Sequence, residues 1–355
     1  MTQTLSPQER INVIHKEYAF VYNILIGFGF VALGIWIGSY IFTDTNGYFT
    51  NVFTEIVSVI ATIFVIDRIN QWRADQQLKI RLLNELRSPV SATAVTALDW
   101  LRRENWIDST YFVDSDFRRA NWEGAFIGGL NFEKAQLSNV TLVSVTNNDD
   151  IYEHPINFRF ANLKGANLSH ASLSYSNFEK AKLWGANLSY AELEKAQFAH
   201  ADLWRAELDK ADIKRANFEG ANLKSASLQN SDLWSSILTN ANLTGVNLCG
   251  ANISDAILED ADLGHARLEC TILSHSDLSR VNLRGASLRG AYLIGANMND
   301  IKWDIIGVNS TILPDGTEWS PDKDIERFTD LNHPEFEATV EKINRIRHEL
   351  GYKPI

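Results

Sequence analysis

The sequence predicts an all-β solenoid, a rod made of stacked coils, preceded by an α-helical hairpin that crosses a membrane. Two observations predict this fold class. An apolar residue returns every five positions through most of the chain, and a stretch of 24 residues near its start, 19–42, carries no charge. The chain has 355 residues and a formal net charge of −11. This length accommodates the rod, the hairpin and a cover at each end of the rod.

The five-residue spacing excludes both regular elements for the repeated region. From residue 163 to residue 303 all 29 positions at this spacing are apolar, beginning with Leu163, Leu168, Leu173 and Phe178. A step of five turns roughly 140° around an α-helix and scatters these side chains over every face. In a straight strand an odd step places alternate side chains on opposite sides. The chain must therefore bend once in every five residues, so that each fifth side chain points at one shared axis.

Two further positions complete the repeat. The residue two before the central apolar residue is usually small, as at Ala161 and Ala166, and the residue between them is usually Asn or Asp, as at Asn162 and Asn167. Turns tolerate Asn and Asp, which can bond their own backbone. This pattern, A(D/N)LXX, resembles the pentapeptide-repeat family. The resemblance implies a right-handed quadrilateral β-helix with four pentads and about 20 residues per coil, in which the central residue and the small residue before it point inward.

An earlier stretch has the same spacing in another register. Its apolar residues are Phe112, Phe117, Trp122, Ile127, Phe132, Leu137 and Leu142. The step from Val145 to Ile156 is eleven residues, so residues 146–155 are predicted to form a loop extruded from one corner and not a domain boundary. The β-helix is therefore expected over residues 110–303.

The N-terminal end of such a rod needs a cover, because an open coil exposes apolar core and unpaired strand edges. Residues 67–109 are predicted to form a helical neck and an N-terminal cap, and Ser88-Pro89 opens the helical pattern of the cap. One side of this cap helix carries Val90, Ala94, Ala97, Leu98 and Leu101. We expect that side to lie on the first coil.

The C-terminal end needs a cover for the same reason, and residues 304–355 are predicted to supply it. The stretch TILPDGTEW, residues 311–319, resembles the tail that often ends the repeats in membrane-associated members of the family. A last helix follows, with Pro334 near its start and Gly351 after its end. One side of this helix carries Phe336, Val340, Ile343 and Leu350. We expect that side to dock on the rod or on a partner.

The front of the chain is predicted to cross a membrane twice. After a tail, residues 1–18, the uncharged residues 19–42 are long enough to cross a hydrocarbon core of ~30 Å at about 1.5 Å per residue. A signal peptide would have a shorter apolar core. Residues 49–66 are mostly apolar, and a second span there is required if both ends of the hairpin, residues 19–66, lie on one side.

Charges around the hairpin predict its orientation. Arg10 and Lys16 precede the first span, the connector has no Lys or Arg, and five Lys and Arg residues follow the second span before the repeats. Both termini and the rod are therefore expected on the cytoplasmic side of a bacterial plasma or thylakoid membrane. Gly34 and Gly38 form a GxxxG step that allows close helix packing or self-association. Glu55 is the one acid in the second span, either a functional intramembrane group or a carboxylate at headgroup level.

The charge distribution bears on two functions that involve nucleic acid. Some soluble pentapeptide-repeat proteins imitate DNA with an acidic rod and bind DNA gyrase, and the net charge of −11 suggests that alternative. However, residues 156–303 contain 16 Asp and Glu against 15 Lys and Arg, so the rod is nearly neutral. The excess acid lies in residues 88–155 and 304–355, outside the long regular faces. The mimic is therefore poorly supported, and binding to nucleic acid itself has no basic patch to rest on.

No catalytic motif accompanies the repeats: the chain has no phosphate loop, no nucleophile elbow and no CxxC pair. We expect no enzyme activity, no cofactor and no metal. Cys249 and Cys270 are predicted at outward positions on neighbouring coils. A cytoplasmic rod favours reduced thiols, although the spacing leaves a disulfide open. Trp184 and Trp204 stand 20 residues apart, so a four-pentad coil would stack them, either as a docking spot or as two indoles that shield each other over Lys164 and Lys224.

The sequence therefore predicts a membrane-tethered, non-enzymatic scaffold. Its rod would display flat faces to an unidentified protein partner, as part of a larger membrane complex. Membrane-anchored proteins with this resemblance are frequent in cyanobacteria. Two alternatives stay open: a DNA-mimicking regulator of DNA gyrase, and an oligomeric channel or transport accessory subunit built from the hairpins.

Overall fold

The computed structural model of the protein describes residues 48–104, 106–107, 111–143, 145, 155–302, 311–319, 333–334 and 336–349. The chain forms two compact units, residues 1–81 and residues 82–355. The described part of the first unit is helical, and the second contains the repeats.

Helix α2, Tyr48–Glu85, is a single helix of 38 residues. A run of its apolar side chains is exposed: Val52, Ile56, Val59, Ile60, Ile63, Phe64 and Ile66. Among the residues that the structure describes, no helix is both long enough and apolar enough to cross a membrane. The predicted second span, residues 49–66, is therefore not supported. Its uncharged portion, residues 56–66, would extend only about 16 Å, roughly half of a hydrocarbon core.

The end of that predicted span is also not a boundary in the structure. Helix α2 continues without interruption through Asp67 and Arg68 to Glu85. Glu55 is exposed on this helix. The predicted first span, residues 19–42, lies outside the described residues, and so do Gly34 and Gly38.

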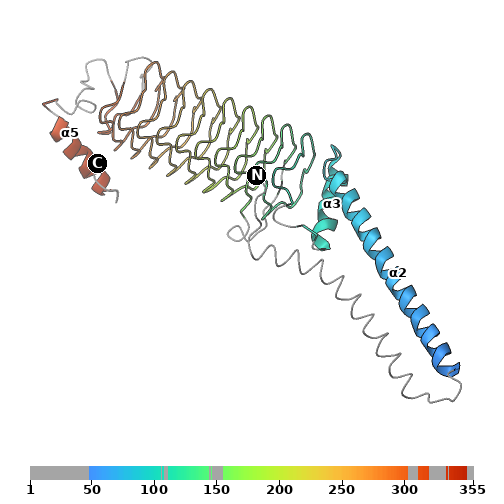
Figure 1. The fold of residues 1–355 in the computed structure, drawn as a ribbon. Coiled ribbons are helices and arrows are strands. Elements are labelled where there is room, and N and C mark those ends of the chain that lie inside the picture. Colours follow the sequence, from blue (N-terminus) through green and yellow to red (C-terminus); the bar gives the residue numbers. More distant parts are fainter. Residues whose placement is uncertain are drawn as a thin grey trace. The chain divides into compact units, whose positions relative to one another are not determined.

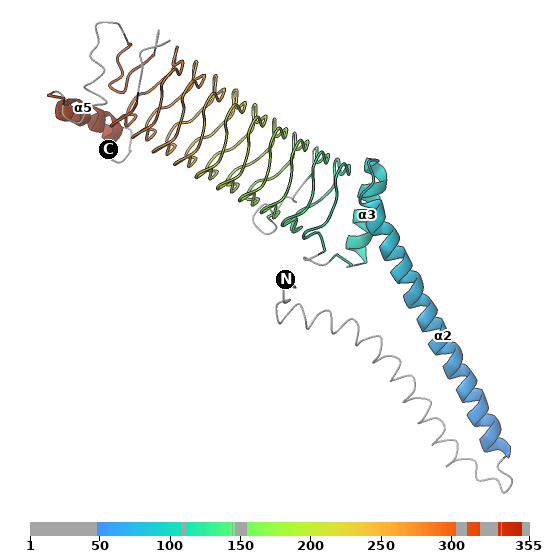
Figure 2. The same ribbon diagram turned by 45° about the horizontal axis from the view of Figure 1, so that its top comes forward.

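The repeats form the stacked coils of a β-helix, seen in Figure 1 and from a second direction in Figure 2. Each pentad contributes one bridge residue, the residue before the central apolar one, and then a two-residue turn. Bridge residues pair in parallel with those 20 positions further on, as Asn162 does with Lys182 and Lys182 with Asp202. A period of 20 gives four pentads per coil. The pentapeptide spacing therefore produces a four-sided β-helix.

Each corner of the coil is a tight turn. The second residue after every described central residue has a φ between 53° and 72°, in the left-handed region. At Gly165 this turn is closed by a 3.0 Å hydrogen bond from the Ala166 N–H to the Leu163 carbonyl. A positive φ at the third turn residue is the signature of a type II turn, which favours Gly. Many corners nevertheless carry a residue with a side chain, at a cost of about 1 kcal/mol or more each.

The coil that contains residues 146–154 is longer than the others. Asn131 pairs with Asn157, and Gln136 pairs with Asn162, which are steps of 26 residues and not 20. The two sequence registers therefore belong to one continuous ladder, with six extra residues in this coil. The predicted loop itself, apart from residue 155, lies outside the described residues.

The interior is filled by the central and small residues of the pentads. Five phenylalanines form one column along the axis: Phe132, Phe158, Phe178, Phe198 and Phe218. Neighbouring rings in this column are stacked, with centroids 4.7 Å apart for Phe178 and Phe198 and 4.8 Å apart for Phe198 and Phe218. The column continues with aliphatic residues such as Leu238. The core is therefore a set of ladders in which each side chain contacts its equivalent in the next coil.

The first coils are covered by helix α3, Ser91–Arg103. Its buried residues are Ala94, Ala97, Leu98 and Leu101. Val90 was predicted on the same side but is 57% exposed, because it is the N-cap residue with extended backbone angles and precedes the helix.

Specific hydrogen bonds fix this cover to the rod. The buried Trp122 Nε1 donates to the Leu86 carbonyl at 2.7 Å, and the Asn121 N–H donates to the Ser88 carbonyl at 2.9 Å. The Ser91 hydroxyl donates to the Glu123 carbonyl at 3.1 Å. The exposed end of the ladder thus finds partners in the segment between α2 and α3, as an uncapped coil edge requires.

The other end closes with a backbone hairpin. Ile312 pairs in parallel with Tyr292 of the preceding coil and in antiparallel fashion with Glu318. Helix α5, Phe336–Glu349, is joined to this hairpin by an ion pair of 3.1 Å between Lys342 Nζ and Asp315 Oδ2. Val340 is half-buried, and nothing is described of the other three apolar side chains predicted on its side of the last helix.

Two glycines test the role of the corners. Gly185 and Gly220 both have a φ of +61°, but an added Cβ would meet open space at Gly185 and the His200 Nδ1 at 2.5 Å at Gly220. Replacing either with Ala should cost about 1 kcal/mol for the left-handed backbone. Gly220→Ala should cost roughly 1 kcal/mol more for displacing the imidazole. The measurement is chemical denaturation, and the extra loss should vanish in a His200→Ala background. Equal losses for the two glycine variants would contradict this account.

The C-terminal closure should depend on pH. Burial by itself raises the pKa of the Asp315 carboxyl, but hydrogen bonds from Thr317 and Lys342 outweigh it, so the pKa lies below its ordinary value of 3.8. A carboxyl with a lowered folded pKa stabilises fully above its unfolded pKa, and that contribution is lost as the pH falls through the folded value. Amide exchange of α5 should therefore differ between wild type and Asp315→Asn near pH 6, and the difference should shrink below about pH 4. A difference that stays constant down to pH 2 would contradict the assignment.

Candidate interaction surface

The coil presents four outward faces. We name them after the central residues of one coil as the 178, 183, 188 and 193 faces. On each face, the bridge residue, the residue after the central one and the corner residue are at least partly exposed at most pentads, while the central and small residues are buried. Residues 20 positions apart lie on the same face. Side chains that are remote in the sequence are thus brought together in columns.

The predicted tryptophan pair lies on the 183 face. The Trp184 and Trp204 rings are stacked, with centroids 5.1 Å apart and planes inclined by 25°. The Lys164 Nζ lies 3.4 Å from the Trp184 ring centroid, and the Arg205 guanidinium carbon lies 4.5 Å from that of Trp204. Both indoles are half-buried. The structure therefore confirms the predicted stacking, and it adds a cation over a ring on each indole.

A hollow of about 470 Å³ adjoins this pair. Its lining residues are Trp184, Asp202, Trp204, Asn222 and Lys224. Within it, the Asn222 side-chain amide donates to Asp202 Oδ1 at 2.9 Å, and the Trp204 N–H donates to the same oxygen at 3.3 Å. The hollow thus combines two indole edges, a cation and a carboxylate.

A second hollow, of about 590 Å³, lies on the same face near the first coils. Three arginines, Arg87, Arg118 and Arg119, line it together with Asp116. The hydrogen bonds from Arg118 are the main reason that the pKa of Asp116 falls to about 2. This carboxylate is therefore ionised at neutral pH, and the hollow keeps a net positive charge.

Counting charges by face separates the four sides of the rod between residues 156 and 302. The 183 face has six basic residues against two acidic ones, a net charge of +4. The 178 face has three basic and six acidic residues, the 193 face three and five, and the 188 face three and three. The basic residues of the 183 face are Lys164, Lys182, Arg205, Lys224, Arg284 and Lys302. A nearly neutral rod therefore carries one basic face.

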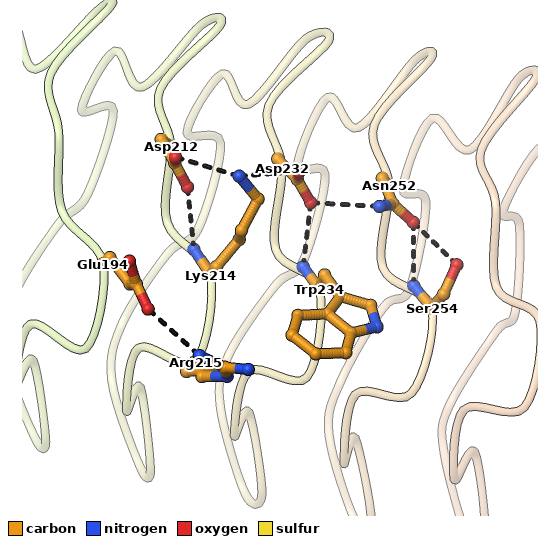
Figure 3. A network of polar contacts seen from close by, with 8 residues as sticks. All are labelled: Glu194, Asp212, Lys214, Arg215, Asp232, Trp234, Asn252 and Ser254. Atoms are coloured by element: carbon orange, nitrogen blue, oxygen red, sulfur yellow. Dashed lines mark hydrogen bonds and ion pairs between the residues drawn. The ribbon is translucent and has the colours of Figure 1, made fainter. Parts of the chain in front are cut away.

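Charges on the 193 face are largely paired with each other, as Figure 3 shows. The Lys214 Nζ lies 3.0 Å from Asp212 Oδ2 and 3.5 Å from Asp232 Oδ2. Arg215 pairs with Glu194 at 3.2 Å, and its guanidinium lies over the Trp234 ring. On the 178 face, Arg159 pairs with Glu179, and Arg280 pairs with Glu259 and Asp260.

The basic residues of the 183 face differ from these. None of the six forms an ion pair with another residue that the structure describes. All six are exposed. Sequence totals missed this surface because the net charge of the repeats averages over four faces. A count taken at the 20-residue period would have found it.

The two cysteines are free thiols. The Cys249 thiol lies 2.8 Å from a Glu269 carboxylate oxygen, and burial together with this carboxylate raises the pKa of the thiol. Cys270 is exposed. Among the described residues, no group of three or more His, Cys, Asp and Glu side chains could bind a metal ion.

Comparison with known proteins identifies the repeat. Eight copies of the family model described as pentapeptide repeats match residues 156–189, 191–230, 226–264 and 261–300. No curated protein matches the chain significantly. The match confirms the predicted pentapeptide repeats within the β-helix, and it does not extend to the predicted hairpin.

Several solved structures are similar to parts of this chain. One is HetL from the cyanobacterium Nostoc, a pentapeptide repeat protein involved in heterocyst differentiation regulation, with 26% identity over 62% of this chain and 98% of its own and a TM-score of 0.27. Another is QnrB1, a plasmid-mediated fluoroquinolone resistance protein, with 19% identity over 53% and 87% and a TM-score of 0.29. A third is Rfr23 from the cyanobacterium Cyanothece, with 31% identity over 29% and 64% and a TM-score of 0.15. With TM-scores this low, none of them indicates a function for this chain.

Proposed function

From the eight pentapeptide-repeat copies in residues 156–300, we propose that this protein is a non-enzymatic scaffold that binds a protein partner on the outside of its β-helix. The inward columns form the core, and the outward columns are free to vary in sequence. One observation carries the proposal: two stacked, half-buried indoles lie on an exterior face beside a hollow of about 470 Å³. Partly exposed aromatic side chains next to a hollow are typical anchors of protein interfaces.

A pull-down with the full chain in mild detergent tests this function. The bait is wild type, a Trp184→Ala/Trp204→Ala variant, or a Trp234→Ala control that removes an indole from the 193 face. Wild type and control should recover the same protein in stoichiometric amount, and the double variant should lose it. A wild-type chain that elutes alone and monomeric, or a partner recovered equally by all three baits, would contradict the proposal.

We also propose that the N-terminal segment tethers the scaffold to a membrane, with both termini and the β-helix on the cytoplasmic side. Support comes from the 24 uncharged residues 19–42 and from the seven exposed apolar side chains of α2 between residues 52 and 66. If apolar segments and not surface charge attach the protein, the full chain should stay in the membrane pellet after alkaline carbonate extraction. Release into the supernatant would contradict the tether and leave the scaffold proposal intact.

The remaining functional alternatives stay predictions. A gyrase regulator should change gyrase activity when residues 88–355 are added to the enzyme. A channel subunit should lose ion flux in liposomes on Glu55→Gln. Packing through Gly34 and Gly38 likewise stays a prediction.

A further inference from the structure

The 183 face is basic on a chain whose net charge is −11. Four of its six basic residues gather around the tryptophan pair within four consecutive coils. We define the Trp patch as Lys164, Lys182, Trp184, Trp204, Arg205 and Lys224. Its one acidic neighbour on the face is Asp202. The patch therefore has a net charge of +3 when that carboxylate is included.

The cations of the patch are available to a ligand. Lys164 and Arg205 lie over indole rings, which does not neutralise their charge, and no residue of the patch forms an ion pair with another described residue. Comparable cations on the 178 and 193 faces are engaged by Glu and Asp side chains. Unpaired cations on a rigid surface lose little conformational freedom or competing interaction when an anionic partner arrives.

The spacing of the patch fits an extended chain. Neighbouring coils in a parallel ladder are separated by about 4.8 Å, so Lys164 and Lys224, three coils apart, are separated by roughly 14 Å along the rod. An extended polypeptide rises about 3.3 Å per residue, so roughly five residues cover that distance. Carboxylates on alternate residues of such a segment would face successive cations.

The chemistry of the hollow favours a polypeptide over a nucleic acid or a phosphate. Trp184 has Lys164 over its ring and Trp204 stacked on it, so the indoles offer edges and not the open ring faces on which bases stack. Asp202 presents a carboxylate there, of which Oδ1 accepts from Asn222 and from the Trp204 N–H. A backbone N–H of a peptide can donate to the second carboxylate oxygen, whereas a phosphate would be repelled by it.

We propose that the Trp patch binds an extended acidic segment of a partner protein, with carboxylates on Lys164, Arg205 and Lys224 and an apolar side chain against the indole edges. This proposal rests on the scaffold function and specifies its partner chemistry. The surface differs from that of a DNA mimic, because it is the basic face and not an acidic one that recognises the ligand.

The test uses the full chain in detergent and a fluorescein-labelled peptide of six glutamates around a central leucine. Binding is measured by fluorescence anisotropy at low and high salt. The patch variant is Lys164→Glu/Arg205→Glu/Lys224→Glu. The control, Lys180→Glu/Lys195→Glu/Arg289→Glu, makes the same change in net charge on the other three faces. The patch variant should bind at least tenfold more weakly, and the control should stay within about twofold of wild type.

Two results would overturn the proposal: a wild-type chain that does not bind the peptide, or equal losses in both variants. Binding of phosphatidylserine vesicles or of a thymidine oligonucleotide that depends on the patch, without peptide binding, would overturn it in favour of another class of anion. Lys164→Gln/Lys224→Gln replaces the patch variant if charge reversal prevents folding, and should also weaken binding. If the pull-down recovers a partner equally with wild type and the patch variant, this inference fails while the scaffold function stands.

Discussion

Replacing Leu223 with glutamate is expected to abolish cooperative folding of the β-helix. Leu223 is fully buried in an interior column, with Leu203 and Leu243 one coil away on either side. A carboxylate at this position would have only apolar side chains around it inside the coil. Burying an unpaired charge costs several kcal/mol even after the group is neutralised, so we expect a loss of at least about 5 kcal/mol.

The matched control is Lys224→Glu, one residue further along. Its side chain is exposed, so the same new charge should change the unfolding midpoint by no more than about 0.5 kcal/mol. Thermal and chemical denaturation followed by circular dichroism measure both variants. If Leu223→Glu unfolds with the wild-type midpoint, the residue does not point inward and the five-residue spacing has been misread.

The phenylalanine column should show the second largest effect. Phe198 is buried between Phe178 and Phe218, with ring centroids 4.7 Å and 4.8 Å away. Phe198→Ala leaves a cavity that the neighbouring coils cannot close, because each is fixed by its own turns and ladder. We expect a loss of about 3 to 5 kcal/mol from chemical denaturation.

Phe198→Leu is the control for this prediction. Leu238 occupies the equivalent position two coils later, so the column accepts a leucine. The loss should then be about 1.5 kcal/mol or less. A cost for Phe198→Ala that is no larger than that for Phe198→Leu would show that the rings do not pack as a continuous stack.

Particular residues show how far the sequence predicts the fold. Leu163 and Ala161 could be assigned to the interior from their spacing alone, because a solenoid repeats the same environment at every pentad. The cap residues Ala94, Ala97, Leu98 and Leu101 followed from helical periodicity in the same way. Val90 did not, because periodicity cannot tell an N-cap from a first helical residue. The second membrane span also failed, since an apolar composition does not state where a helix ends.

The candidate site was predictable only in part. The Trp184 and Trp204 stack follows from a separation of 20 residues once the coil length is known. Their cationic neighbours do not follow from total charge, because Lys182 and Arg205 are close to acidic residues in the sequence but lie on a different face from most of them. The arginine-lined hollow near Arg118 also depends on the 26-residue coil, which aligns the first two coils with the later ones.

The sequence by itself determined the inside of this protein: which side chains are buried, that the chain bends every five residues, and that the ends need covers. It could do so because burial is dictated locally, by the apolar residue within each pentad. The tertiary structure alone decided the outside. Whether two exposed side chains share a face depends on the number of residues in every intervening coil, and the paired or unpaired state of each charge depends on what the neighbouring coils place beside it.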